Sequence, residues 1–528
     1  MTINSEKIFS KLILLLLVIT FVIRLVGLTK SPPGFFSDEA SFGYNAFSIA
    51  ETGKDEHGFF MPVFFKALGD YKNPIQIYAM APIVKIFGLS IFSVRLTSAL
   101  FGMGSILLFI YFINILTKNK NLALLGGIVL SAMPWHFLYS RIGFEAMSFV
   151  FFIVLAMVFF AKFIETKKEW HFFIFCLSMI IGFFSYSTAR LILPISALAI
   201  AILWRKDIFK KRSVAMILFL SVLIFSFLMF YDYIINPMGI TDRAGSVSIS
   251  NFSPSIFATA GYFINNYINH FSPQFLFQSG DYNLRHSSGI SSMMLTVFAV
   301  PLIFGLAYFI KQIKNSKFAK FVIFMIITFP LASSLTIIEE GAQATRSIHI
   351  IPFLAIIIAV GIWQMHVLLK DKNRLVLIAL SLFFLIELSM FYNNYFFIYP
   401  VKAAGYFNYG LPEAFEIAIK ENPDYYYVSK NISTFGIEMP FFMKYDPKKF
   451  QTNKVIPNVK YLYPEKLENP KSNSVAIYRA ADNIKHFPDE ELLYSGSYSK
   501  RVVKKDMKTG KDYYDHESYD THYVYEYK

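Results

Sequence analysis

The sequence has little charge and almost no cysteine. Only 16% of its 528 residues are charged, whereas 55% are hydrophobic and 18% are aromatic. An ordinary soluble domain carries about 25% charged residues, so this composition excludes that class. The single cysteine, Cys176, lies within an apolar run, which excludes an intramolecular disulfide. There is also no internal repeat and no low-complexity stretch.

Long apolar runs are what the sequence has in abundance. Runs of about 20 residues can cross a bilayer core roughly 30 Å thick as helices, and we expect about eleven such spans. The first run has a basic flank but no small-x-small cleavage site, so we expect an uncleaved span. The stretch "SYSTARLILP" interrupts the run 171–204 only weakly. The expected spans are 8–28, 91–116, 121–139, 146–165, 171–187, 190–204, 213–231, 291–311, 318–338, 347–369 and 373–391.

The net charge of +14 is explained by its placement along the chain. Lys/Arg-rich connections gather on the cytoplasmic side of membrane proteins, so this charge does not indicate nucleic-acid binding. Eleven spans with the N-terminus inside place five short basic connections in the cytoplasm: 117–120, 165–171, 204–212, 311–320 and 370–374. The same count places the acid-bearing segments outside: 29–90, 139–146, 232–290, 339–346 and the tail.

The tail, residues 392–528, differs in composition from the rest. It is rich in charge and tyrosine, with a helix-like stretch "LPEAFEIAIKEN" and strand-like stretches "DYYYVS", "SVAIYRA" and "THYVYEYK". Its length of about 135 residues suits one domain. We therefore expect a transmembrane domain over 1–391 and a small extracytoplasmic α/β domain over 392–528.

Two adjacent acids, Asp38 and Glu39, follow the first span in "GFFSDEASFGYN". Ser37 suits an N-cap, and the apolar spacing after it predicts an amphipathic helix over 38–51 on the outer membrane surface. The acids then lie in the first turn, where they favour the helix dipole, and this structural explanation stays open.

Cations and further acids occupy the other outside segments. Lys72 lies in "GDYKNPI", on the outer side, where lysine is less common than on the cytoplasmic side. Either an anionic ligand or simple solvation in a loop explains a lysine at this place. Arg141 and Glu145 are four residues apart in "SRIGFEA", a spacing also typical of a plain ion pair. The remaining charged candidates are Asp281, Arg285 and His286 in "GDYNLRH", near Asn283, and Arg346 and His349 in "ATRSIHIIP".

Acids beside cations above a bilayer suit transfer from a lipid-linked phosphate sugar. Cations stabilise the phosphate as it leaves, and a carboxylate takes the proton of the attacking hydroxyl. We expect Asp38 to be the general base and Glu39 to hold the loop through an arginine. Lys72, Arg141 and Arg346 are expected at the donor phosphate, and the other site candidates are Asp70, Glu145, Asp281, Arg285 and His286.

At these residues the chain resembles the protein O-mannosyltransferase and lipid A aminoarabinose transferase superfamily, a polyprenyl-phosphate-sugar-dependent group with the GT-C fold. The matching features are "SDEA", "GDYKNPI", "SRIGFEA", "GDYNLRH" and "ATRSIHIIP", in that order and on the same side of the membrane. The resemblance covers most of residues 8–390 and is much weaker in the tail. It implies a polytopic α-helical membrane protein of the bacterial type.

The resemblance also implies roles for single residues. Asp38 matches the family's catalytic acid, with Glu39 as its neighbour, and Lys72 matches the lysine of a Lys-x-Pro segment near the donor phosphate. The segment here reads "YKNP" rather than "EKPP", so the acid before the lysine is Asp70, two places away. Glu145 stands where the family often has an aspartate. Arg346 resembles an arginine that contacts donor phosphate, and Asp281, Arg285 and His286 match a pattern of bacterial members.

Two functional classes follow from the sequence. The first is an inverting glycosyltransferase that moves a hexosyl or pentosyl group from a polyprenyl-phosphate-linked sugar donor to a hydroxyl of a glycan, lipid or protein. The second is a membrane transporter or channel, which usually carries ionisable residues at mid-membrane. Charges here gather at the outer ends of uninterrupted spans, which favours the enzyme. We expect no metal and no cofactor; the expected partners are the donor, the acceptor and the lipid bilayer.

Overall fold

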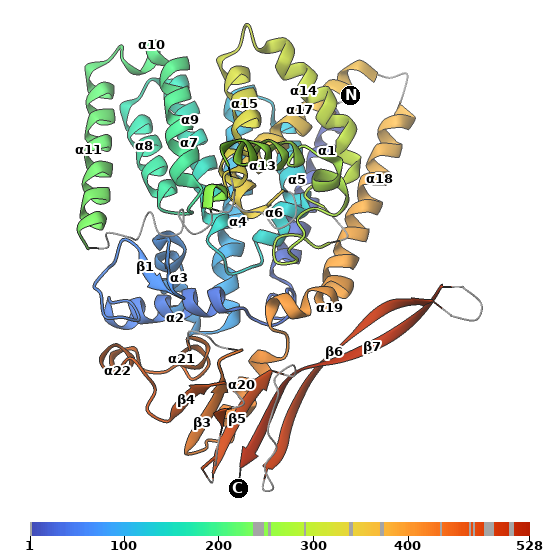
Figure 1. The fold of residues 1–528 in the computed structure, drawn as a ribbon. Helices are drawn as coiled ribbons and strands as arrows, with labels where there is room; N and C mark the ends of the chain where they lie inside the picture. Colours follow the sequence, from blue (N-terminus) through green and yellow to red (C-terminus); the bar gives the residue numbers. More distant parts are fainter. Residues whose placement is uncertain are drawn as a thin grey trace. The chain divides into compact units, whose positions relative to one another are not determined.

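The computed structural model describes most of the chain (Figure 1). The described residues are 3–235, 248–251, 255–289, 292–336, 342–369, 374–432, 436–463, 466–467, 470–471, 473–479, 490–505 and 512–527. They form two compact units, and each unit draws on separate parts of the sequence. Unit 1 comprises Met1–Val26, Asp70–Gln76 and Leu96–Asn394; unit 2 comprises Gly27–Gly69, Ile77–Arg95 and Tyr395–Lys528.

The described part of unit 1 is built of helices, with one short strand, β2 (Asp70–Lys72). Two further helices, α3 (Pro74–Phe87) and α4 (Ile91–Thr117), contribute residues to both units. The other helices of unit 1 are α1 (Ile3–Leu25), α5 (Lys120–Ala132), α6 (Pro134–Tyr139), α7 (Ala146–Thr166), α8 (Glu169–Phe183), α9 (Ala189–Leu203), α10 (Arg205–Ile208), α11 (Arg212–Ile235), α13 (Ile256–Asn269), α14 (Ala299–Gln312), α15 (Lys317–Thr328), α16 (Leu331–Ser334), α17 (Ile351–Leu369) and α18 (Arg374–Asn393).

Every span expected from the sequence contains a helix, which confirms a polytopic helical fold. Within the described residues, six helical stretches are long and apolar enough to cross a membrane, and five shorter apolar helices of 10–17 residues accompany them. The expected span 121–139 is divided at Pro134, which is the first residue of α6. The expected span 318–338 contains α15 and α16, which together form one apolar helical stretch, Lys317–Ser334. The weakly interrupted run 171–204 is two helices, α8 and α9.

The helices of unit 1 pack through small residues where backbones come close. A Cβ atom on Gly305 of α14 would lie 1.9 Å from the carbonyl oxygen of Ile357 on α17. A Cβ on Gly361 of α17 would lie 1.8 Å from the carbonyl oxygen of Pro301 on α14. Glycine is therefore required at both positions, as is common where membrane helices cross closely.

Unit 2 combines the loop after the first span with the tail. Its sheet has the strand order β4-β3-β5-β7-β6, with β3 parallel to β4 and β5 and with β7 antiparallel to β5 and β6. Leu411, Phe415, Val428 and Ile477 lie in its core, and the predicted mixed α/β character of the tail is confirmed. Its elements are α2 (Ser37–Thr52), β1 (Phe65–Ala67), α19 (Tyr399–Ala403), α20 (Leu411–Lys420), β3 (Tyr425–Ser429), α21 (Glu438–Phe442), α22 (Pro447–Asn453), β4 (Val459–Leu462), β5 (Ser474–Arg479), β6 (Glu490–Lys505) and β7 (Asp512–Tyr527).

The helix predicted over 38–51 is confirmed as α2, but its one-sided amphipathic pattern is wrong. Phe42, Asn45 and Ala46 are all buried, while Phe47 on the expected apolar face is half-buried. Helices α21 and α22, about 400 residues later in the chain, pack against α2. The Tyr44 hydroxyl donates to the carbonyl oxygen of Tyr445 at 3.1 Å, which fixes part of this contact.

Glu56, just after α2, is a buried acid of unit 2. The Asn45 amide donates to its carboxylate at 2.9 Å. Burial raises the pKa of Glu56 to about 8, and nearby Asp55 adds to the effect, although the hydrogen bond from Asn45 opposes it.

Unit 2 should therefore lose stability as the pH rises from about 4.5, the ordinary value, to about 8. In that window the unfolded chain releases the Glu56 proton while the folded chain retains it. Glu56→Gln should remove this loss, which we expect to measure as a thermal unfolding midpoint in detergent that falls less between pH 5 and pH 9 than in the wild type. Equal slopes for both proteins would show that Glu56 is not the titrating group.

Candidate active site

Asp38 and Glu39 lie in the first turn of α2, in two different environments. Asp38 is half-buried, whereas Glu39 is fully buried. Adjacent helical side chains point about 100° apart, which explains the difference. The prediction that Ser37 caps the helix is wrong: Phe36 occupies the N-cap, and the Ser37 hydroxyl donates to the Glu438 carboxylate at 2.6 Å.

Arg95, at the start of α4, pairs with Glu39. Its Nε and Nη2 atoms donate to the two carboxylate oxygens at 2.9 and 3.0 Å, a bidentate geometry. The remaining N–H groups donate to the carbonyl oxygens of Leu28, Pro32 and Gly34, each at 2.8 Å. All five guanidinium donors are thus used. Through Arg95, Glu39 holds the segment 28–34 against α2. Asp38 is the more accessible of the two acids.

In unit 1, Lys72 lies next to a hydrogen-bond network that includes Glu145. Lys72 is buried, with its Nζ 3.8 Å from the carboxylate of Asp70. The next residue, Asn73, donates to Glu145 from its backbone N–H at 3.2 Å and from its side chain at 2.9 Å. Arg190 donates to the Asn73 side-chain oxygen at 3.1 Å. Glu145 and Arg190 therefore fix the backbone next to Lys72, and the segment 141–145 that a helical ion pair would need is not helical.

The segment 280–286 is tied to the segment before α17. The Asp281 carboxylate accepts from the backbone N–H of Ala344 at 2.7 Å and lies 3.2 Å from the His286 ring. The His286 ring stacks on Tyr139, whose hydroxyl is hydrogen bonded to Thr345. These contacts position Arg346, which is half-buried and donates to the Thr336 hydroxyl. Arg285, in the same segment as Asp281, is also half-buried.

Arg141 is fully buried and contacts the end of α1. Its Nη1 donates to the carbonyl oxygens of Ile23 and Arg24 at 2.9 and 2.7 Å, and its Nη2 donates to that of Val26 at 2.7 Å. The last carbonyls of a helix have no partner within the helix, and a cation there also favours the dipole. This geometry favours a role for Arg141 in ending α1 rather than in binding phosphate.

The polar residues of these networks that were not among the sequence candidates include Arg24, Asn73, Arg95 and Arg190. Arg24 is buried in α1 and donates to the Ser131 hydroxyl at 3.0 Å and to its carbonyl oxygen at 2.7 Å. The three arginines could have been found, because an arginine inside an apolar span is unusual enough to be a candidate by itself. Asn73 carried no such signal. Within the described residues no group of three or more His, Cys, Asp or Glu side chains could hold a metal ion.

Comparison with known proteins agrees with this architecture. Residues 72–230 match the model of the dolichyl-phosphate-mannose-protein mannosyltransferase family. The structure is similar to that of ArnT from Cupriavidus metallidurans bound to undecaprenyl phosphate, with 12% sequence identity, coverage of 98% of each chain and a TM-score of 0.55. For ArnT in the apo state the identity is 12%, the coverage 89% of this chain and 93% of that chain, and the TM-score 0.53. No curated protein matches the chain in sequence. The predicted GT-C fold is confirmed.

Proposed function

Because this chain has the GT-C fold and matches a mannosyltransferase family over residues 72–230, we propose that it is an inverting glycosyltransferase. The donor is a polyprenyl-phosphate sugar, and the acceptor is a hydroxyl on the extracytoplasmic side. One observation carries the assignment of roles: of two adjacent acids, Glu39 is buried and paired with Arg95, while Asp38 is half-buried. We therefore assign the acceptor to Asp38, the more exposed acid of the two.

In the proposed reaction Asp38 accepts the proton of the acceptor hydroxyl. The hydroxyl oxygen bonds to the anomeric carbon as the bond from that carbon to the phosphate oxygen breaks, and polyprenyl phosphate leaves. Attack from the face opposite the phosphate inverts the configuration. Lys72 and Arg346 neutralise the phosphate as charge develops on it. ArnT was crystallised with undecaprenyl phosphate, which supports a donor of this class here.

Lipid-linked-sugar profiling tests the proposal most directly. Cells that lack the protein should accumulate one polyprenyl-phosphate sugar, and its sugar is the one transferred. The purified protein should then release polyprenyl phosphate from that donor, and its product should carry the opposite anomeric configuration. Solute flux in proteoliposomes without any sugar transfer would instead support the transporter.

Removing either proposed phosphate ligand should weaken donor use. Loss of one partner of a buried charge pair costs about 2–5 kcal/mol, so Lys72→Ala and Arg346→Ala should each lower donor turnover by tens-fold or more at limiting donor. Lys66→Ala, at an exposed lysine near Lys72 in sequence, is the matched control and should leave turnover unchanged. Full activity in both variants would show that neither residue binds the donor phosphate, and Arg285 would then be the next candidate.

The basic connections predict that residues 392–528 lie outside the cell membrane. A C-terminal tag should therefore be cleaved by protease added to intact spheroplasts, and a cytoplasmic marker protein should survive the same treatment. Protection of the tag would place the tail, and Asp38 with it, on the cytoplasmic side, and would contradict the proposed sidedness.

A further inference from the structure

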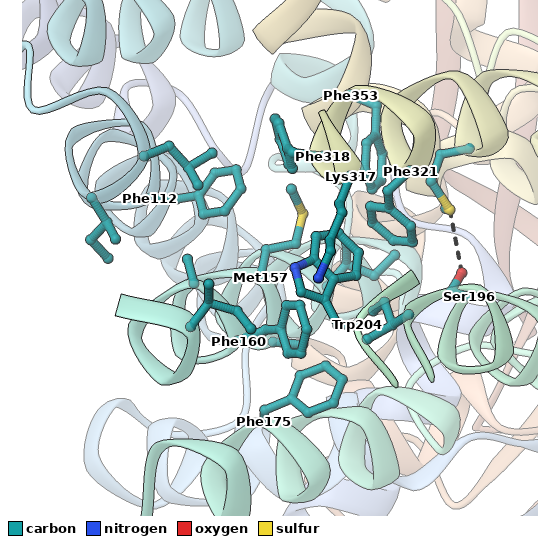
Figure 2. Close-up of a pocket in the computed structure, with 18 of the residues that line it drawn as sticks. Phe112, Met157, Phe160, Phe175, Ser196, Trp204, Lys317, Phe318, Phe321 and Phe353 are labelled. Carbon is teal, nitrogen blue, oxygen red and sulfur yellow. Dashed lines mark hydrogen bonds between the residues drawn. The ribbon is translucent and has the colours of Figure 1, made fainter. Parts of the chain in front are cut away.

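Unit 1 contains an apolar cavity of about 490 Å³ among α4, α7, α8, α9, α15 and α17. Its walls are mostly apolar, and they include Met157, Phe160, Trp204 and Phe321 (Figure 2). This volume is in the range of small-molecule sites in proteins, which are also mostly apolar with a few polar groups. Helices α4, α7, α15 and α17 belong to stretches long and apolar enough to cross a membrane, and α8 and α9 are shorter apolar helices, so an apolar lipid chain suits this cavity.

One end of the cavity carries polar groups. Glu165, near the end of α7, and Lys317, at the start of α15, both line it. Figure 2 shows the Lys317 side chain extending among the aromatic side chains. This end lies where the Lys-rich connections join the helices, and Asp207 of α10 is 3.0 Å from the Lys317 Nζ.

The charges around this end do not balance. Lys118 and Lys162 both pair with Glu165, and Lys167 and Lys317 both pair with Asp207. Four lysines and two carboxylates leave a net charge of +2 in this lysine rim, which we define as these six residues. A positive rim above an apolar cavity complements a molecule with an anionic head and an apolar tail.

We propose that the cavity holds one acyl chain of an anionic glycerophospholipid, with the lipid phosphate at the lysine rim. Basic pockets between membrane helices are recognised by anionic head groups, whereas a zwitterionic lipid carries no net charge for the rim to attract. The site differs from the proposed donor site. Glu145, beside the Lys72 segment, immediately precedes the first residue of α7, and Glu165 is near its last, so about 30 Å of helix separates them.

Photolabelling of the purified full-length protein tests this site. Phosphatidylglycerol with a diazirine in one acyl chain should label peptides that contain Met157 and Phe321, and unlabelled phosphatidylglycerol should compete. Phosphatidylcholine with the same chains should label them several-fold less. Equal labelling by both lipids, labelling confined to other helices, or stronger competition by polyprenyl phosphate would each overturn the proposal.

Two kinds of variant sharpen the test. Each rim lysine contributes about fivefold to the preference for an anionic lipid, so Lys167→Gln and Lys317→Gln together should reduce phosphatidylglycerol labelling at least tenfold and leave phosphatidylcholine labelling unchanged. Lys320→Gln, at an exposed lysine of α15 that does not line the cavity, is the matched control. Ala156→Phe should fill the cavity and prevent labelling by both lipids. If that variant does not fold, the double lysine variant still tests the proposal. Unchanged phosphatidylglycerol labelling of the double lysine variant would overturn it.

Discussion

Asp38→Asn should lose about 10²–10⁴-fold in transfer rate, which is the usual contribution of a general base. Asparagine keeps the size and most hydrogen bonding of aspartate but has no basic charge to accept a proton. Since Asp38 is half-buried at the start of α2 and Glu39 keeps its partner Arg95, the fold should be unchanged. Single-turnover transfer from the donor identified by profiling measures the rate, and donor binding measured separately should stay near normal.

Glu51→Gln is the matched control for this variant, because Glu51 is an exposed acid on the same helix. It should transfer sugar at the wild-type rate. If Asp38→Asn stayed active while a folded Glu39→Gln variant were inactive, the two roles would have to be exchanged. If neither substitution changed the rate, the acids would serve only to stabilise the helix dipole.

The helical architecture could be predicted because membrane spans depend on a local property, the length of an apolar run. The break at Pro134 could not be predicted from proline alone, because Pro82 and Pro194 lie inside continuous helices. It could not be predicted from the sequence that unit 2 combines the loop after the first span with the tail. Helix α2 is covered by α21 and α22, and no feature of residues 38–51 indicates that contact with a segment about 400 residues away. The hydrogen bonds between the buried Asn45 and Glu56 are by contrast local, since 11 residues separate the two in sequence.

The candidate residues show the same division between local and tertiary information. Asp38, Lys72 and Arg346 are recognisable in short motifs, and their roles stay proposals. Their supporting residues depend on tertiary contacts: Asn73 connects Glu145 to Arg190, although the three lie far apart in sequence. The expectation that Glu39 has an arginine partner agrees with the structure, but the sequence did not identify Arg95.

Substitution of Arg95 should have the largest effect on stability. Arg95→Met would leave the Glu39 carboxylate buried without its bidentate partner, and breaking a buried pair in this way costs about 3–5 kcal/mol. It would also remove the donors to the carbonyl oxygens of Leu28, Pro32 and Gly34. The expected result is a clearly lower thermal unfolding midpoint and faster protease cleavage within residues 28–36.

Arg95→Lys should also lower the thermal unfolding midpoint, because an ammonium group has three donors and cannot reach five acceptors in a planar arrangement. Lys85→Met, at an exposed residue of α3 within unit 2, controls for the loss of one cation and should leave the midpoint unchanged. The double variant Arg95→Met with Glu39→Leu removes the unpaired charge and should recover part of the lost stability. Recovery would show that most of the cost came from the isolated carboxylate. If Arg95→Met were as stable as the wild type, Glu39 would not need its charge compensated, and its assignment as a positioning residue would be wrong.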